Sequence, residues 1–105
     1  MNVEIVNNAE YERELYGSLL RHRIPHRMHR PVVEYIMRGR PTGNFLQALF
    51  SNDLMDAFGR ADDDNICVMA EYVKFLYNDA PIGCYGSPKA YAGWIEARGQ
   101  SGFRP

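Results

Sequence analysis

The chain contains little cysteine, no long apolar run and almost no net charge, and each shortage excludes a class of proteins. Two cysteines among 105 residues are too few for a small secreted scaffold, which carries four to eight. No apolar run approaches the roughly 20 residues of a membrane span, and residues 1–8 lack the basic and apolar regions of a signal peptide. A formal net charge of −1 excludes a uniformly basic nucleic-acid coat. We therefore expect a protein of a reducing, cytoplasmic compartment.

The remaining composition is typical of a small globular domain. The residues are 46% hydrophobic, 24% charged and 12% aromatic, which excludes a disordered or low-complexity chain. Apolar residues recur every three to four positions between turn signals. The sequence thus predicts an all-α fold, a compact single domain over residues 1–105 with five or six short helices. Residues 1–8 should form a flexible arm that includes a short extended segment, and residues 100–105 a flexible tail.

Capping residues and prolines set the expected limits of the first two helices. Asn7 and Glu10 have the spacing of a capping box, and Pro25 should end the helix that they open. Pro31 suits the first position of a second helix, because its missing N–H is unpaired there in any case. Gly39 suits the left-handed position just after the end of that helix.

The later helices also have candidate caps. Thr42 should cap a third helix, and Ser51 or Asn52 a short fourth one. Ser87 followed by Pro88 predicts the start of the last helix, since proline is favoured at the first helical position.

The strongest helical pattern covers residues 63–79. One apolar stripe consists of Ile66, Met69, Ala70, Val73, Leu76 and Tyr77, and a second flank of Val68, Tyr72 and Phe75. A helix that is apolar on two flanks is normally covered by several neighbours. We therefore expect residues 63–79 to form the central helix of the domain.

Charges of opposite sign are concentrated in two segments. Residues 20–40 contain six arginines and Glu34, a formal charge of +5, together with all three histidines. Residues 51–80 contain seven acids against Arg60 and Lys74, a formal charge of −5. The bases of the first segment are all arginine, whose planar guanidinium suits phosphates and carboxylates. The candidate partner- or ligand-binding residues are Arg21, Arg23, His26, Arg27, Arg30, Arg38 and Arg40.

Two explanations of this segregation remain open. Either the two segments pair with each other across helix interfaces or simply solvate the surface, or the arginines bind an acidic protein, a nucleotide or a nucleic acid. Pro31 argues against one continuous arginine stripe, because a proline inside a helix clashes with the preceding turn. Pairing between subunits would instead produce a homo-oligomer.

The sequence contains no recognisable catalytic or metal-binding motif. It has no nucleophile elbow, no Walker loop and no zinc-protease motif. His22 and His26 have the spacing of a helical ligand pair, but Cys67 and Cys84 lie too far apart for a zinc-site pair. Cys84 could act as a nucleophile only beside a histidine, and Cys67 is expected in the core. We therefore expect neither an enzyme nor a cofactor or metal site.

Part of the chain resembles a known family. Residues 44–62, which read NFLQALFSNDLMDAFGRAD, resemble small helical proteins of phages, prophages and other mobile elements. The segments FLYNDAP (75–81) and CYGSP (84–88), and the pair Trp94-Ile95, resemble the same family, in which tryptophan is usual at the position of Tyr85. The resemblance extends over about residues 24–96. It implies an origin in a mobile element and work inside a bacterial cell, without an established activity.

These observations favour a binding protein over an enzyme. Small phage proteins without catalytic motifs often act on host proteins, so we expect stoichiometric binding to a host macromolecule such as a defence or replication factor, which would be inhibited. The alternative is a nucleic-acid- or nucleotide-binding protein that uses the arginine-rich segment 21–40.

Overall fold

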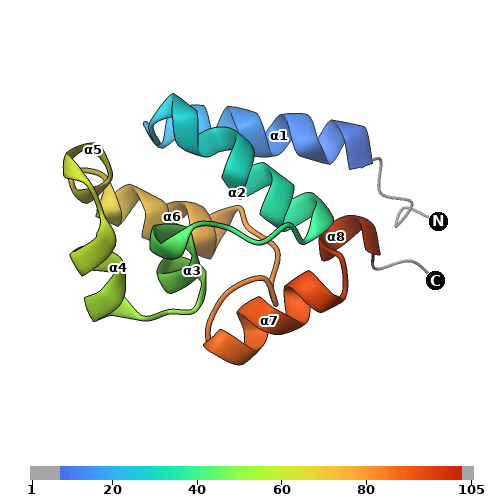
Figure 1. Cartoon of the computed structure of the whole chain (residues 1–105). Coiled ribbons are helices and arrows are strands. Elements are labelled where there is room, and N and C mark those ends of the chain that lie inside the picture. Colours follow the sequence, from blue (N-terminus) through green and yellow to red (C-terminus); the bar gives the residue numbers. More distant parts are fainter. Residues whose placement is uncertain (1–7, 103–105) are drawn as a thin grey trace.

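The computed structural model describes residues 8–102, and its regular elements are all helices (Figure 1). They are α1 (Asn8–Arg21), α2 (His26–Arg38), α3 (Asn44–Phe50), α4 (Leu54–Arg60), α5 (Asp63–Ile66), α6 (Met69–Asn78), α7 (Pro88–Glu96) and α8 (Gly99–Gly102). The all-α class is therefore confirmed, with more and shorter helices than expected. The radius of gyration of 13.3 Å is that of a compact domain of this size.

Helix α2 supplies the largest part of the core. Its apolar positions Val32, Val33, Tyr35, Ile36 and Met37 are each at most 1% exposed. It contacts α1, α7 and α8, so its buried face is covered on several sides. The core is thus shared among α2, α3 and α6, and the expectation of one central helix over residues 63–79 is not confirmed.

Polar groups tie the loop before α7 and α7 itself to α2. The hydroxyl of Tyr35 donates to the buried carbonyl of Cys84 over 2.6 Å. The indole Nε1–H of Trp94 lies 3.1 Å from the carbonyl oxygens of both Tyr35 and Ile36. The Tyr35 ring also stacks on Tyr91, with centroids 5.1 Å apart. Burial of these polar atoms is possible because each has a partner.

The expected continuous helix over residues 63–79 is instead divided into α5 and α6. The break lies at Cys67 and Val68, and Val68 has the non-helical angles φ −121°, ψ 24°. The side-chain amide oxygen of Asn65, which is 3% exposed, accepts a 2.6 Å hydrogen bond from the hydroxyl of Tyr72. This bond holds α5 against α6. Apolar spacing continues across the break, which is why the pattern did not reveal it.

The expected start of α2 at Pro31 is wrong. The helix begins at His26, five residues earlier, and Pro31 lies inside it. Pro25 precedes the first turn, and its carbonyl accepts from the N–H of Met28 over 2.9 Å. Pro31 removes one intrahelical hydrogen bond, that to the carbonyl of Arg27. The rest of the helix is retained because its apolar stripe is fully buried.

Two expected caps are confirmed and two are wrong. Gly39 ends α2 with φ 68°, and the side chain of Ser87 accepts from the N–H of Ala90 at the start of α7. Thr42 does not cap α3, because its hydroxyl lies against the carbonyl of Gly43 and the hydroxyl of Tyr91.

The cap of α4 is Asp53, not Ser51 or Asn52. Its side chain accepts from the N–H of Asp56 over 3.1 Å. Asn52 has φ 61° and belongs to the turn before the cap.

The chain ends differ from the expectation in one respect. Residues 100–102 of the expected tail are helical and form part of α8, which packs against α2. Gly39 and Gly99 allow this packing, since a Cβ on Gly99 would lie 2.7 Å from the backbone nitrogen of Arg38. The expected arm, its extended segment and the Asn7 cap lie outside the described residues, except for Asn8, which begins α1.

Candidate functional site

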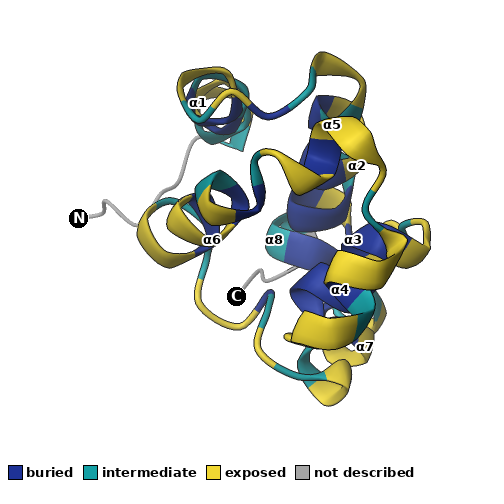
Figure 2. Ribbon diagram, turned by 90° about the vertical axis from the view of Figure 1, so that its left-hand side faces the viewer, coloured by how far each residue is buried: buried dark blue, intermediate teal, exposed yellow. Residues whose placement is uncertain are grey.

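An apolar groove of about 310 Å³ lies where α3, α4 and α6 meet. Its floor is formed by the buried side chains of Leu49, Ala57, Met69 and Leu76. Both α4 and α6, which flank the groove, carry exposed residues along their length (Figure 2). The floor belongs to the core, so the groove is already formed without a ligand.

The walls of the groove are large apolar side chains in contact with solvent. Leu54 and Phe58 of α4 are 64% and 45% exposed, and Val73 and Tyr77 of α6 are 55% and 82% exposed. Each pair has the i, i+4 spacing that places two side chains on one face of a helix. Apolar side chains that line an open groove, with a few polar groups beside them, are a common feature of binding sites. The groove is the candidate functional site.

The acidic segment forms part of this surface. Asp53 lines the groove at the start of α4. Both cations of residues 51–80 are paired with acids, Arg60 with Asp56 at 3.0 Å and Lys74 with Glu71 at 3.6 Å. Asp53 has no cationic partner in the described chain. The groove therefore carries one unpaired negative charge, that of Asp53.

The arginine segment does not form a single site. Arg27 reaches from α2 to α5, where it pairs with Asp62 and, at 3.0 Å, with Asp64. The backbone N–H of Asn65 and then Arg27 lower the pKa of Asp62, and the two aspartates raise the pKa of Arg27. For Arg27, this contact confirms pairing between the basic and acidic segments, one of the explanations left open.

Two more arginines of the segment are also occupied. Arg38 lies 2.9 Å from Glu12 and 3.3 Å from Glu34. Arg40 lies 3.3 Å from Glu34. The hydrogen bond that Arg38 donates to Glu12 raises the pKa of Arg38. Arg38 thus links α1 to the end of α2, whereas Arg40 pairs with Glu34 of α2 itself.

All seven predicted residues are exposed, and four of them have no acidic partner in the described chain. Arg21, Arg23 and Arg30 have no acidic partner among residues 8–102. His26 is exposed as well, with its ring centroid 5.2 Å from that of the buried His29. They lie on the end of α1, the turn after it and the first half of α2.

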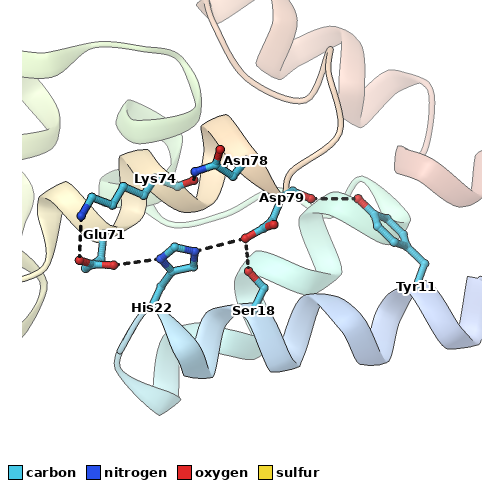
Figure 3. A network of polar contacts seen from close by, with 7 residues as sticks. All are labelled: Tyr11, Ser18, His22, Glu71, Lys74, Asn78 and Asp79. Carbon is cyan, nitrogen blue, oxygen red and sulfur yellow. Dashed lines mark hydrogen bonds and ion pairs between the residues drawn. The ribbon is translucent and has the colours of Figure 1, made fainter.

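His22 belongs to a polar network between α1 and α6 (Figure 3). Its Nδ1 lies 2.9 Å from Glu71 and its Nε2 3.2 Å from Asp79. Ser18 donates to the same Asp79 oxygen over 2.6 Å. Because both ring nitrogens face carboxylates, both contacts are hydrogen bonds only when the ring carries two protons. The bond to His22 lowers the pKa of Glu71. The network fastens α1 to α6.

The two cysteines differ in exposure. Cys84 is fully buried, and burial raises the pKa of its thiol to about 12. A thiol in that state is not an activated nucleophile. Cys67, which was expected in the core, is exposed at the break between α5 and α6. Over the part of the chain that the structure describes, no group of three or more His, Cys, Asp or Glu residues could hold a metal ion.

Comparison with known proteins adds no relative: no family model, no curated protein and no solved structure matches the chain. The resemblance to proteins of mobile elements therefore stays a prediction. Within residues 8–102, no helix has both the length and the apolar character needed to cross a membrane.

Sequence reasoning missed the groove because it expected the wall formed by α6 to be covered by neighbouring helices. Val73 and Tyr77 belong to the apolar stripe that was expected to be covered, but the structure buries Tyr72 and Phe75 instead. The sequence signal for an exposed apolar face was the second apolar flank of residues 63–79. A helix that is apolar on two flanks has more apolar surface than one small core covers.

Proposed function

We propose that the chain is a binding protein that holds another protein in the groove between α4 and α6. The observation that carries this proposal is the set of four exposed apolar walls, Leu54, Phe58, Val73 and Tyr77, around a buried floor. Water in contact with such a surface is released when a partner covers it, which supplies the free energy of association. A preformed groove also avoids the entropy cost of ordering a loop.

Two further points support a macromolecular partner. The groove is mainly apolar and open, with acidic charge at its edge, as is common for protein interfaces. The resemblance to proteins of phages and prophages supports a partner in a bacterial host cell. Binding in a one-to-one complex would then block the partner's own surface.

Capture from a bacterial lysate by matched variants tests this function. Val73→Glu adds one charge to the groove wall at a half-exposed position. Ile82→Glu adds the same charge at a residue that is 93% exposed, outside the groove, in the loop between α6 and α7. Both variants should fold, which circular dichroism checks.

We expect wild type and Ile82→Glu to capture the same protein in stoichiometric amount, and Val73→Glu to lose it. Equal capture by the two variants would contradict a function of the groove. A low- and high-salt wash separates apolar from purely ionic capture, since exposed ion pairs weaken in salt.

A nucleic-acid ligand at Arg21, Arg23 and Arg30 is the second candidate. The observation that favours it is the lack of an acidic partner for these three exposed arginines in the described chain. Arg27 is not a suitable position for this test, because its replacement would also break the contact with Asp62 beside α5. Binding of a fluorescent oligonucleotide should weaken steeply with salt and on replacing the three arginines by alanine. Unchanged affinity in that variant would exclude this site.

A further inference from the structure

We infer that the groove's occupant is a basic amphipathic α-helix of the partner protein. This inference rests on the proposed function and specifies the partner's chemistry. It follows from the hydrogen-bonding state of the groove, from the spacing of its walls and from its charge.

The hydrogen-bonding state excludes an extended peptide. The groove is lined mainly by residues of α3, α4 and α6, whose backbone groups already bond within their helices. The described chain also has no strand, and so no sheet edge that could add one. An extended peptide in this groove would bury its own N–H and C=O groups without partners, at a cost of about 1–3 kcal/mol each. A helix satisfies these groups internally.

The spacing of the walls fits the ridges of a helix. Leu54 and Phe58 form one pair at i, i+4, and Val73 and Tyr77 another. Side chains with this spacing are about 5–6 Å apart, which is also the distance between successive side chains on one face of a docked helix. Three alanines, Ala48, Ala57 and Ala70, lie between the walls. Their small side chains leave space for large apolar residues of the partner.

The charge requires basic residues beside those apolar ones. Asp53 lines the groove, and only one of its oxygens is engaged, by the N–H of Asp56. Asp62 and Asp64 pair with Arg27, and Glu71 and Asp79 lie against His22. The charge that the groove itself offers a partner is therefore that of Asp53. Lys or Arg next to the apolar positions of the partner helix would face this charge and accelerate encounter. The partner segment therefore has apolar residues at i, i+3 or i+4 and i+7, with basic residues on both sides.

A set of three synthetic peptides tests the inference. The first has leucine at i, i+3, i+4 and i+7 and lysine at the flanking positions. The second has glutamate in place of lysine, and the third is the lysine peptide with a central proline that prevents helix formation. Binding of each labelled peptide is measured by fluorescence anisotropy against wild type, Val73→Glu, Ile82→Glu and Asp53→Asn.

We expect the lysine peptide to bind at least about ten-fold more tightly than the other two, which corresponds to 1.4 kcal/mol. Val73→Glu should lose this binding and Ile82→Glu should keep it. Asp53→Asn keeps the cap, since asparagine caps as well as aspartate, and should weaken the lysine peptide by about two- to five-fold.

The outcomes separate this inference from the proposed function. Equal binding of the glutamate or proline peptide, or lysine-peptide binding that survives Val73→Glu, would overturn the basic helix. The groove function would still stand if Val73→Glu abolished capture from the lysate. Light scattering at rising concentration tests a second copy of the chain. A dimer that Val73→Glu dissociates would also overturn the inference, because the occupant would then be the chain itself.

Discussion

Replacing Gly39 with alanine tests the contact between α2 and α8. Gly39 has φ 68°, and a Cβ placed on it would lie 2.7 Å from the nitrogen of Gly99 and 2.8 Å from the Cα of Arg98. Both neighbours are backbone atoms, so no flexible side chain can turn away. The added methyl group can be accommodated only if α8 moves away from α2.

The expected cost has two parts. A left-handed conformation costs a residue with a Cβ about 1–2 kcal/mol. Forcing packed groups apart typically costs about 1–3 kcal/mol more. We therefore expect Gly39→Ala to lower the free energy of unfolding by about 2–5 kcal/mol. That loss corresponds to a fall in Tm of roughly 10 °C or more for a domain of this size.

Two other glycines serve as controls for the two parts. Gly86 has φ 129° with nothing within 4 Å of an added Cβ, so Gly86→Ala measures backbone strain without a clash. Gly93 lies within α7, has no positive φ and also faces open space, so Gly93→Ala should stabilise by about 0.5–1 kcal/mol. Urea unfolding followed by the fluorescence of Trp94, the chain's one tryptophan, gives all three values. A loss at Gly39 of no more than about 1–2 kcal/mol, which a left-handed conformation costs by itself, would refute the close approach of α2 and α8.

Three further predictions concern the polar and sulfur groups. Tyr35→Phe leaves the buried carbonyl of Cys84 without its donor and should cost about 1–3 kcal/mol in urea unfolding; a neutral effect would contradict that bond. The bond to His22 holds the pKa of Glu71 below its usual 4.5 in the folded chain. The stability that Glu71 contributes is therefore present above pH 4.5 and is lost as the pH falls through the lowered value. His22→Ala removes this bond, so its free energy of unfolding should be less sensitive to acid. Unfolding at pH 7 and pH 3 checks this, and equal acid sensitivity of wild type and variant would count against the network. A thiol reagent at pH 8 should label exposed Cys67 at once and Cys84 only after unfolding, because burial raises the pKa of the Cys84 thiol to about 12. In Cys67→Ser the remaining thiol is that of Cys84, so rapid labelling of this variant would disprove the burial of Cys84.

The sequence predicted those parts of the fold that depend on local chemistry. Gly39 ends a helix because it can adopt a left-handed conformation. Ser87 caps α7 because its side chain accepts a hydrogen bond from the N–H of Ala90. Both effects act within a few residues, and both were expected.

The parts that depend on contacts between distant residues were not predictable. Pro31 was expected to begin a helix, but packing of the α2 stripe on the core outweighs the one hydrogen bond that the proline removes. The break before α6 depends on the bond between Asn65 and Tyr72 across two helices. Apolar periodicity contains no information about such a bond.

The candidate site was missed for a related reason. The sequence locates charge and apolar side chains, but not which of them a neighbour covers. Arg27 looked free and pairs with Asp62, whereas Val73 looked covered and is half exposed. Exposure depends on the tertiary arrangement, and the groove exists because α4 and α6 line the same hollow.

The contact between Gly39 and Gly99 also affects how the protein is made. The two residues lie 60 positions apart in the chain, yet their backbones touch. While the ribosome is still translating, the end of α2 lacks the helix that covers it, because α8 is synthesised only after the intervening helices α3 to α7. A nascent chain therefore exposes apolar surface of α2, including Met37, until synthesis has passed residue 99. Chaperones and neighbouring nascent chains compete for that surface in the interval.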